Sequence, residues 1–238
     1  MALAHHRFAG ELGGKLVLAG PLDAAGAATA LAVNIAGGAL LGIDPDGERL
    51  KWGIRHGICD FLVNHLSEAL RILKNEIRKK QPASVWLHSE PAPCLAEMLD
   101  RGVQPDILAR AFADSAAALL AMFAARGAVT LADLADPLPC EVTWSVASAP
   151  ALWLPRIDAL AAAAIETAAD ARQRWIRLAP RYLGRSSLVE RYVRLTVEES
   201  ERFANHLRKE VASGQIGVPV SLQIECNGCR EQLEFGKP

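Results

Sequence analysis

The stretch from Lys15 to Asp46, KLVLAGPLDAAGAATALAVNIAGGALLGIDPD, limits the fold more than any other part of the sequence. It begins with an apolar run that ends at a glycine. It continues into an alanine-rich helical segment over 24–36 and a second apolar run over 39–43, which Asp44 follows. Short apolar runs bounded by glycine are typical of buried strands. A strand, a helix and a strand in this order predict two parallel strands joined by a right-handed crossover.

Strands and helices continue to alternate after this unit. The pattern predicts helices over 68–79, with Ser67 as the N-cap, and over 94–102. It also predicts a strand over 83–88, and a strand or loop over 103–108. Alternating strands and helices favour an α/β fold, which we expect to be a Rossmann-like, doubly wound, mostly parallel sheet with helices on both faces.

The rest of the sequence predicts helices over 109–126, 156–178 and 186–212, and a strand over 218–226. We expect the tail beyond this strand to be irregular. No repeat, low-complexity linker or change in composition marks a boundary. We therefore predict one domain over residues 1–238.

Composition excludes several classes of function. The formal net charge of −1 gives no general electrostatic attraction to nucleic acid or to an anionic membrane. No run approaches the roughly 18 apolar residues that a membrane span needs, and the N-terminus lacks the apolar core of a signal peptide. The five cysteines are irregularly spaced and do not indicate a disulfide framework. We expect a cytoplasmic protein.

Cys226 and Cys229 form a single CxxC motif, CNGC. One such pair is half of a zinc site, and the sequence holds no second pair. A redox CxxC usually opens a helix, whereas this one follows a predicted strand. We therefore expect two ordinary thiols and no metal site, with a metal or redox role as the less favoured alternative.

Several segments resemble, in order and spacing, the urocanase (urocanate hydratase) family. They are GGKLVLAG, ALAVNIAGGALLGIDPDGER, LSEALRILKNEIRKKQPASVWLHSEPAPCLAEMLDRGVQPDIL, ADSAAALLAMFAARGAVTL, TWSVASAP, RQRWIRLA, LVERYVRLTVEESERF and VASGQIGVPVSLQIECNGC. The resemblance covers roughly residues 12–229 and corresponds to the central part of the much longer urocanases. It implies a Rossmann-like domain that holds NAD, which urocanases use as an electrophile toward the imidazole ring.

The glycine turn departs from the family pattern. Urocanases have a turn of the form GxGGxGGAQ, where glycines allow the backbone to approach the pyrophosphate. Here the stretch is GPLDAAGAA, so Gly20 and Gly26 remain while Leu22, Asp23 and Ala25 replace glycines. Leu22 adds bulk, and Asp23 places a negative charge where a helix N-terminus would attract phosphate.

Four further residues complete the candidate site. Asp44 matches a family glutamate at a strand end, where a carboxylate can accept from ribose hydroxyls, although DPDG is also an ordinary turn sequence. Arg49 matches a cofactor-contacting arginine of the family. His88 and Glu90 follow the third predicted strand and line a possible cleft, with a plain surface histidine as the alternative for His88.

The resemblance identifies no catalytic residue. The family's catalytic cysteine corresponds to Val193, and its substrate-binding arginine to Thr143. Valine cannot ionise, and threonine cannot form a bidentate pair with a carboxylate. We therefore expect no urocanate hydratase activity.

These observations lead to one hypothesis and two alternatives. The leading hypothesis is a divergent, truncated urocanase-like pseudoenzyme with a weak NAD site built on Gly20, Gly26, Asp44 and Arg49. One alternative is an enzyme with altered lyase or hydratase chemistry in the same cleft, using His88, Glu90 or Cys229. The other is a scaffold or regulatory subunit without ligands. Because the outer parts of a urocanase have no counterpart here, we expect a homodimer or a partner protein to cover exposed apolar surface.

Overall fold

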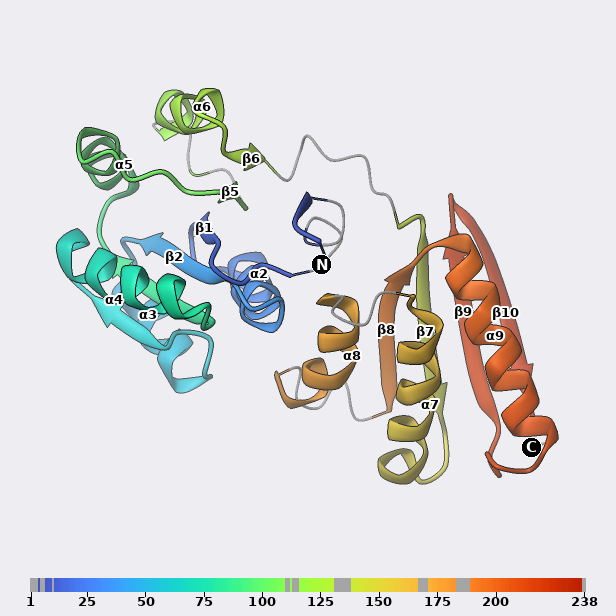
Figure 1. Ribbon diagram of the computed structural model, residues 1–238. Helices are drawn as coiled ribbons and strands as arrows, with labels where there is room; N and C mark the ends of the chain where they lie inside the picture. Colours follow the sequence, from blue (N-terminus) through green and yellow to red (C-terminus); the bar gives the residue numbers. More distant parts are fainter. Residues whose placement is uncertain are drawn as a thin grey trace. The chain divides into compact units, whose positions relative to one another are not determined.

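A computed structural model describes residues 4, 7–9, 11–109, 112, 116–130, 138–166, 171–182 and 189–236. The chain divides into two compact units (Figure 1): the first holds residues 11–134, and the second holds residues 1–10 together with 135–238. The sequence around this division, LADLADPLP, has no glycine–serine run that would mark a linker. Assignment of residues 1–238 to one urocanase-like domain stays a prediction.

The first unit contains a sheet of six strands, all paired in parallel. The strands are β1 (Leu16–Ala19), β2 (Ala39–Asp44), β3 (Phe61–Val63), β4 (Ala83–His88), β5 (Ile107–Leu108) and β6 (Val129–Thr130). Their order in the sheet is β3-β4-β2-β1-β5-β6. From β1 the chain forms β2, β3 and β4 on one side, with β4 between β2 and β3, and it then continues on the other side of β1 with β5 and β6. The predicted Rossmann-like class is therefore confirmed for this unit, and its topological switch point lies between β1 and β5.

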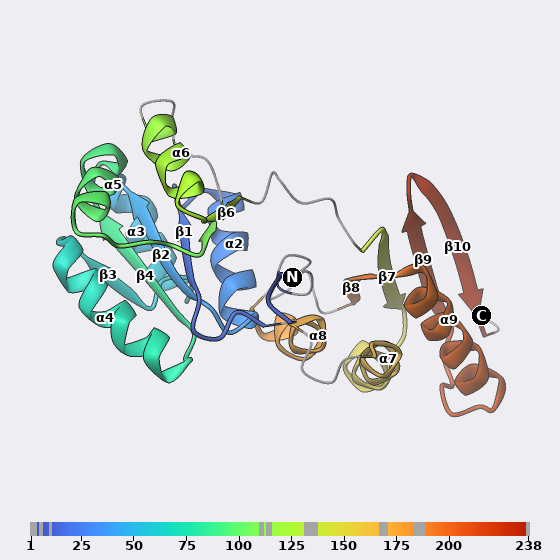
Figure 2. The ribbon, with the colours of Figure 1, turned by 45° about the horizontal axis from the view of Figure 1, so that its top comes forward.

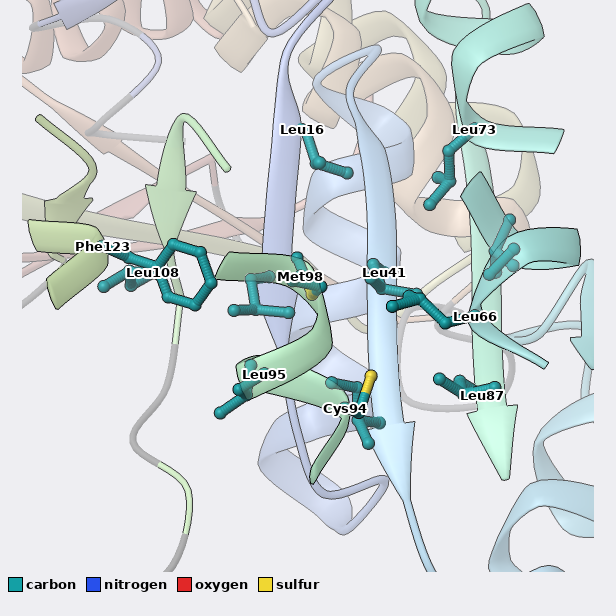
Figure 3. Packing of buried hydrophobic residues seen from close by; sticks show 14 of the residues in the cluster. Leu16, Leu41, Leu66, Leu73, Leu87, Cys94, Leu95, Met98, Leu108 and Phe123 are labelled. Atoms are coloured by element: carbon teal, nitrogen blue, oxygen red, sulfur yellow. The ribbon is translucent and has the colours of Figure 1, made fainter. Parts of the chain in front are cut away.

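In the described part of this unit, helices surround the sheet. They are α2 (Ala24–Ile35), α3 (Gly47–Arg55), α4 (Leu66–Lys79), α5 (Pro91–Asp100) and α6 (Ala117–Ala125). Side chains of α4, α5 and α6 form a buried core with one face of the sheet, where Leu73, Leu95 and Phe123 pack toward Leu41 and Leu87 (Figure 3). Figure 2 shows α2 on the other side of the sheet from α4 and α5. The alternation of side chains along each strand supplies apolar groups to both faces.

Local signals misplaced one helix start and missed two short elements. α4 begins at Leu66 with His65 at the N-cap, so the prediction of Ser67 as the cap was wrong. The sequence analysis did not predict α3 or β3, which have nine and three residues. Elements of this length carry too little periodicity to be recognised without their packing partners.

The second unit contains an antiparallel sheet in the order β10-β9-β7-β8. Its strands are β7 (Cys140–Val146), β8 (Glu190–Leu195), β9 (Val220–Cys226) and β10 (Cys229–Phe235). Its helices are α7 (Pro150–Ala164), α8 (Ala171–Tyr182) and α9 (Val197–Ala212). Buried Arg172 on α8 makes a bidentate ion pair with Glu199 at the start of α9, which joins these two helices.

Three predictions for this unit were wrong. The segment 186–212 was expected to be one helix, but residues 190–195 form β8, and the segment 156–178 is shared between α7 and α8. The tail was expected to be irregular, but it forms β10. Asn227 and Gly228 have φ values of 51° and 78°, which is the conformation of a two-residue type I′ hairpin turn.

The cysteines also differ from expectation. Cys140 and Cys226 form a disulfide although 86 residues separate them, because β7 and β9 pair them directly. The prediction that Cys226 is an ordinary thiol was therefore wrong. Cys229 is an exposed free thiol. Strand register, which brings Cys140 beside Cys226, cannot be read from cysteine spacing.

Neither a membrane span nor a metal cluster is found in the described part of the chain. No helix there is long and apolar enough to cross a membrane. No group of three or more histidine, cysteine, aspartate or glutamate side chains there could hold a metal ion.

Candidate functional site

The candidate site in the first unit is the crevice at the switch point between β1 and β5. Gly20 follows β1, and Phe112 lies a few residues beyond β5. A Cβ atom on Gly20 would collide with the ring of Phe112 and would lie 2.7 Å from the carbonyl oxygen of Ile43. Phe112 is 7% exposed. Its ring therefore occupies the space directly against the glycine turn, where open α/β sheets usually bind ligands.

The rest of the turn is closed by contacts within the chain. Gly26 is required by packing, since a Cβ there would collide with the carbonyl oxygen of Pro21. The Asp23 carboxylate caps α2 and accepts a hydrogen bond of 2.8 Å from the Gly26 N–H. Leu22 is buried against α3, where a Cβ on Gly53 would lie 2.5 Å from its Cδ2 atom. Leu22 thus packs between the turn and α3. The side chain that lies against Gly20 is that of Phe112 and not that of Leu22.

Asp44 joins the turn to α3 through four hydrogen bonds. Its Oδ2 accepts from the Leu22 N–H at 2.7 Å and from Arg49 Nε at 2.9 Å. Its Oδ1 accepts from the Asp46 N–H at 2.8 Å and from Arg49 Nη2 at 2.7 Å. An ionised carboxylate offers about four acceptor positions, so this set uses them all. The Asp44 side chain is 0% exposed, whereas that of Arg49 is 41% exposed.

The donors around Asp44 outweigh its burial. Burial alone would raise the pKa of this carboxyl group, but the hydrogen bonds from Arg49 and from the Asp46 and Leu22 N–H groups hold the pKa below its ordinary value of 3.8. Asp44 is therefore ionised at neutral pH. A charge-assisted bidentate pair of this kind fixes the position of both partners.

His88 and Glu90 lie at the end of β4, as predicted, and both are exposed. His88 Nε2 lies 3.0 Å from the Pro45 carbonyl oxygen, and because a carbonyl can only accept, this nitrogen carries the proton. A Cβ on Gly47 would lie 3.5 Å from the His88 ring, which places the ring over the start of α3. Glu90 is the N-cap residue of α5, and its side chain makes no capping hydrogen bond. Cys229 belongs to the other unit.

The two positions that the resemblance relates to urocanase chemistry lie on neighbouring strands. Thr143 on β7 pairs with Tyr192 on β8, and Val142 pairs with Val193. Directly paired residues share a face of a sheet, and successive residues alternate between faces. The side chains of Thr143 and Val193 therefore lie on opposite faces of this sheet.

A pocket of about 510 Å³ lies between α7, α8 and β8 in the second unit. Its volume is within the range of small-molecule sites. Apolar side chains form much of its wall: Pro155, Ala159, Ala162, Ile176 and Pro180. Its polar groups are Asp158, Gln173, Arg177, Arg181 and Arg191. The sequence analysis selected none of these residues.

Asp158 holds one of the three pocket arginines in place. Its Oδ2 lies 3.3 Å from Arg191 Nε, and its Oδ1 accepts from Trp144 Nε1 at 3.0 Å. Burial raises the pKa of Asp158 above its ordinary value, although Arg191 and Trp144 act in the opposite direction. Three arginines against one carboxylate leave the pocket with an excess of positive charge.

One sequence signal could have found this pocket. Gln173, Arg177 and Arg181 follow one another at intervals of four residues, so they share a face of α8. The helix predicted over 156–178 includes Gln173 and Arg177 but ends before Arg181. Arg191 and Asp158 come from other elements, and only the fold brings them to α8.

The Asp44 network predicts a measurable, pH-dependent loss of stability. Asp44→Asn should lower the free energy of unfolding by about 2 kcal/mol at neutral pH. This loss is smaller than that for breaking a fully buried ion pair, because Arg49 is partly exposed and can be hydrated when its partner is removed. The pKa of Asp44 is lower in the folded protein than in the unfolded chain. This stabilisation is therefore fully present above pH 3.8, and it is lost as the pH falls through the pKa of Asp44 in the folded protein. Urea unfolding at neutral and at acid pH measures the difference, which should shrink in acid.

Asp46→Asn is the matched control for this measurement. Asp46 caps α3 through the N–H groups of Glu48 and Arg49, and asparagine caps helices about as well as aspartate. Asp46 also pairs with Arg49, but both side chains of this pair are exposed, and exposed ion pairs contribute little to stability. We expect a change below about 0.5 kcal/mol for this variant. Equal effects of the two substitutions would contradict a special role for Asp44.

The comparison with known families agrees with this fold and with its position in the chain. Residues 1–117 match the sequence model of the urocanase Rossmann-like domain. The match spans β1 to β5 and ends at the start of α6. It confirms over this range the resemblance found in the sequence, while the resemblance of the later segments stays a prediction. Over residues 1–117 this chain is therefore recognised as similar to the urocanase Rossmann-like domain.

Proposed function

We propose that this chain is a non-catalytic relative of urocanases, without urocanate hydratase activity, whose dinucleotide crevice is closed by its own side chains. The observation that carries the proposal is the contact of Phe112 with Gly20. In urocanases, as the resemblance implies, this fold holds NAD. A dinucleotide on this turn would need the space beside Gly20, and the Phe112 ring would have to leave it.

The electrostatics of the turn support the same conclusion. A helix N-terminus binds phosphate through its free N–H groups. At α2, the Asp23 carboxylate already accepts from the Gly26 N–H. A diphosphate would therefore meet a fixed negative charge. The residues present at this turn do not fit a dinucleotide in the conformation described above.

Asp44 and Arg49 have structural roles that account for their presence without a cofactor. The acceptor positions of Asp44 are filled, and the side chain is buried, so a ribose hydroxyl would have to displace one of its donors. Gly20 and Gly26 are likewise required by close packing. The four residues that the sequence offers for NAD thus maintain the turn, which supports weak binding at most.

The second unit supports the proposed absence of hydratase activity. Val193 is 3% exposed and lies in an apolar pair with Val142. It offers neither a nucleophile nor a proton. Thr143, the counterpart of the family's substrate-binding arginine, has no positive charge and lies on the other face of the sheet.

A second candidate function is the binding of a small anion in the pocket between α7 and α8. Arg177 and Arg181 are spaced for one ligand group, and Arg191 is positioned by Asp158. The apolar wall would contact the body of such a ligand. A phosphate or carboxylate attached to a compact apolar group has the chemistry that this lining complements.

Titration with NAD tests the closed crevice. We expect no binding by calorimetry at about 1 mM NAD, which corresponds to an affinity weaker than about −4 kcal/mol. The double variant Phe112→Ala, Asp23→Ser should open the crevice, while serine in place of Asp23 still caps α2. We expect NAD to bind this variant at least tenfold more tightly than it binds the natural chain. Phe123→Ala, which removes a buried ring on α6, controls for general loosening.

The opposite results would contradict the closed crevice. Micromolar NAD binding by the natural chain that falls with Asp44→Ala would mean that the turn is a working pocket. Consumption of urocanate by the purified protein would contradict the absence of hydratase activity. If the opened variant folds and still fails to bind, Phe112 and Asp23 are not what excludes NAD.

Phenyl phosphate is a suitable probe for the pocket in the second unit, because it joins a dianion to an apolar ring. Arg177→Ala and Arg181→Ala should each weaken its binding about tenfold, and added salt should weaken it further. Arg194→Ala is the matched control, because Arg194 lies on β8 beside Glu141 and does not line the pocket. Equal losses in all three variants would indicate non-specific attraction.

Self-association is our proposal for the exposed apolar groups of the first unit. Trp52, Ile54 and Phe61 are 41%, 46% and 44% exposed. Phe61 lies on β3 at the edge of the sheet, where unpaired backbone groups can join a second copy. Light scattering should give twice the mass of one chain. Phe61→Glu should halve that mass, whereas Leu152→Glu in the other unit should not, and a monodisperse monomer would contradict the proposal.

A further inference from the structure

Three cysteines form a row across the sheet of the second unit. Cys140 on β7 pairs directly with Cys226 on β9, and Cys226 pairs directly with Cys229 on β10. Directly paired residues of neighbouring strands project from the same face. The three sulfur atoms therefore lie on one face of the sheet, with Cys226 between the other two.

The two pairs within this row differ in geometry. The two-residue turn at Asn227 and Gly228 makes Cys226 and Cys229 the pair that closes the hairpin, so the N–H and C=O groups of Cys226 point toward β10. Toward β7, Cys226 consequently belongs to a pair without backbone hydrogen bonds. Such pairs bring the Cα atoms closest together, and those of Cys140 and Cys226 are 4.1 Å apart.

The three thiol positions also differ in access to solvent. Cys140 is fully buried, and its sulfur is bonded to that of Cys226. Cys229 is exposed and free. A free thiol thus stands next to the central sulfur of a disulfide, on the side away from the leaving sulfur. Thiol–disulfide exchange requires this arrangement of attacking, central and leaving sulfurs.

We propose that Cys140, Cys226 and Cys229 form a thiol–disulfide exchange site in which the disulfide moves along the row. Cys229 loses its proton, and its thiolate attacks Sγ of Cys226. The bond between Cys226 and Cys229 forms as the bond between Cys140 and Cys226 breaks. The electron pair of the broken bond passes to Sγ of Cys140, which takes up a proton. One disulfide and one thiol are present before and after the step, so no oxidant is consumed.

The other two cysteines do not compete in this exchange. Cys59 and Cys94 belong to the first unit and are buried. Burial raises the pKa of each thiol to about 12, so both stay protonated near neutral pH. The inference stands apart from the proposed function of the first unit, because it rests on residues of the second.

Peptide mapping by mass spectrometry tests the proposal on the full chain. Air-oxidised protein is incubated at about pH 8, quenched with acid, unfolded, and alkylated with N-ethylmaleimide without reduction. In Cys229→Ser we expect only the linkage between residues 140 and 226. In Cys140→Ser we expect the linkage between 226 and 229. The natural chain should contain at least ten times more alkylated Cys140 than Cys229→Ser does.

Two results would overturn the exchange site. One is a Cys140→Ser protein, folded by circular dichroism, that forms no linkage between 226 and 229. The other is a natural chain whose Cys140 is alkylated no more than in Cys229→Ser. Cys229→Ser replaces an exposed side chain at a hairpin end, so this comparison does not depend on a fragile variant.

Discussion

The buried carboxylate of Asp44 is the interaction on which the first unit depends most. It connects the end of β2 to the turn after β1, through Leu22, and to α3, through Arg49. The same turn would hold a pyrophosphate in a dinucleotide-binding protein. Here its backbone N–H groups bind carboxylates of the chain itself, at Asp44 and at Asp23. The turn is thereby fixed in shape without a ligand.

The loss of open space at the crevice follows from a second constraint. Phe112 lies in the connection between β5 and α6. In this connection the ring of Phe112 lies against Gly20. In a dinucleotide-binding turn, the missing side chain of a glycine such as Gly20 allows a phosphate to approach the backbone. Here it allows the ring of Phe112 to approach. Phe112 also belongs to the buried core under α4, α5 and α6, so the ring connects this core to the turn.

The two units distribute their polar groups in opposite ways. In the first unit, Asp44 and Arg49 at the end of β2 are paired with each other. In the second unit, arginines of α8 and β8 line a pocket, and a free thiol stands beside a disulfide. The pocket arginines and the free thiol beside the disulfide therefore lie outside the part of the chain that matches the urocanase domain.

The sequence by itself determined the parallel sheet, the glycine turn, Asp44 at the end of β2 and the similarity of residues 1–117 to the urocanase Rossmann-like domain. These are local or periodic features, and short-range sterics and burial encode them. Only the tertiary structure decided that Phe112 meets Gly20, that Asp44 is saturated by its own chain, and that Cys140 is bonded to Cys226. Each of these features depends on contacts between segments that are distant in the sequence. Strand order and register bring such segments together, and neither segment's own sequence indicates its partner.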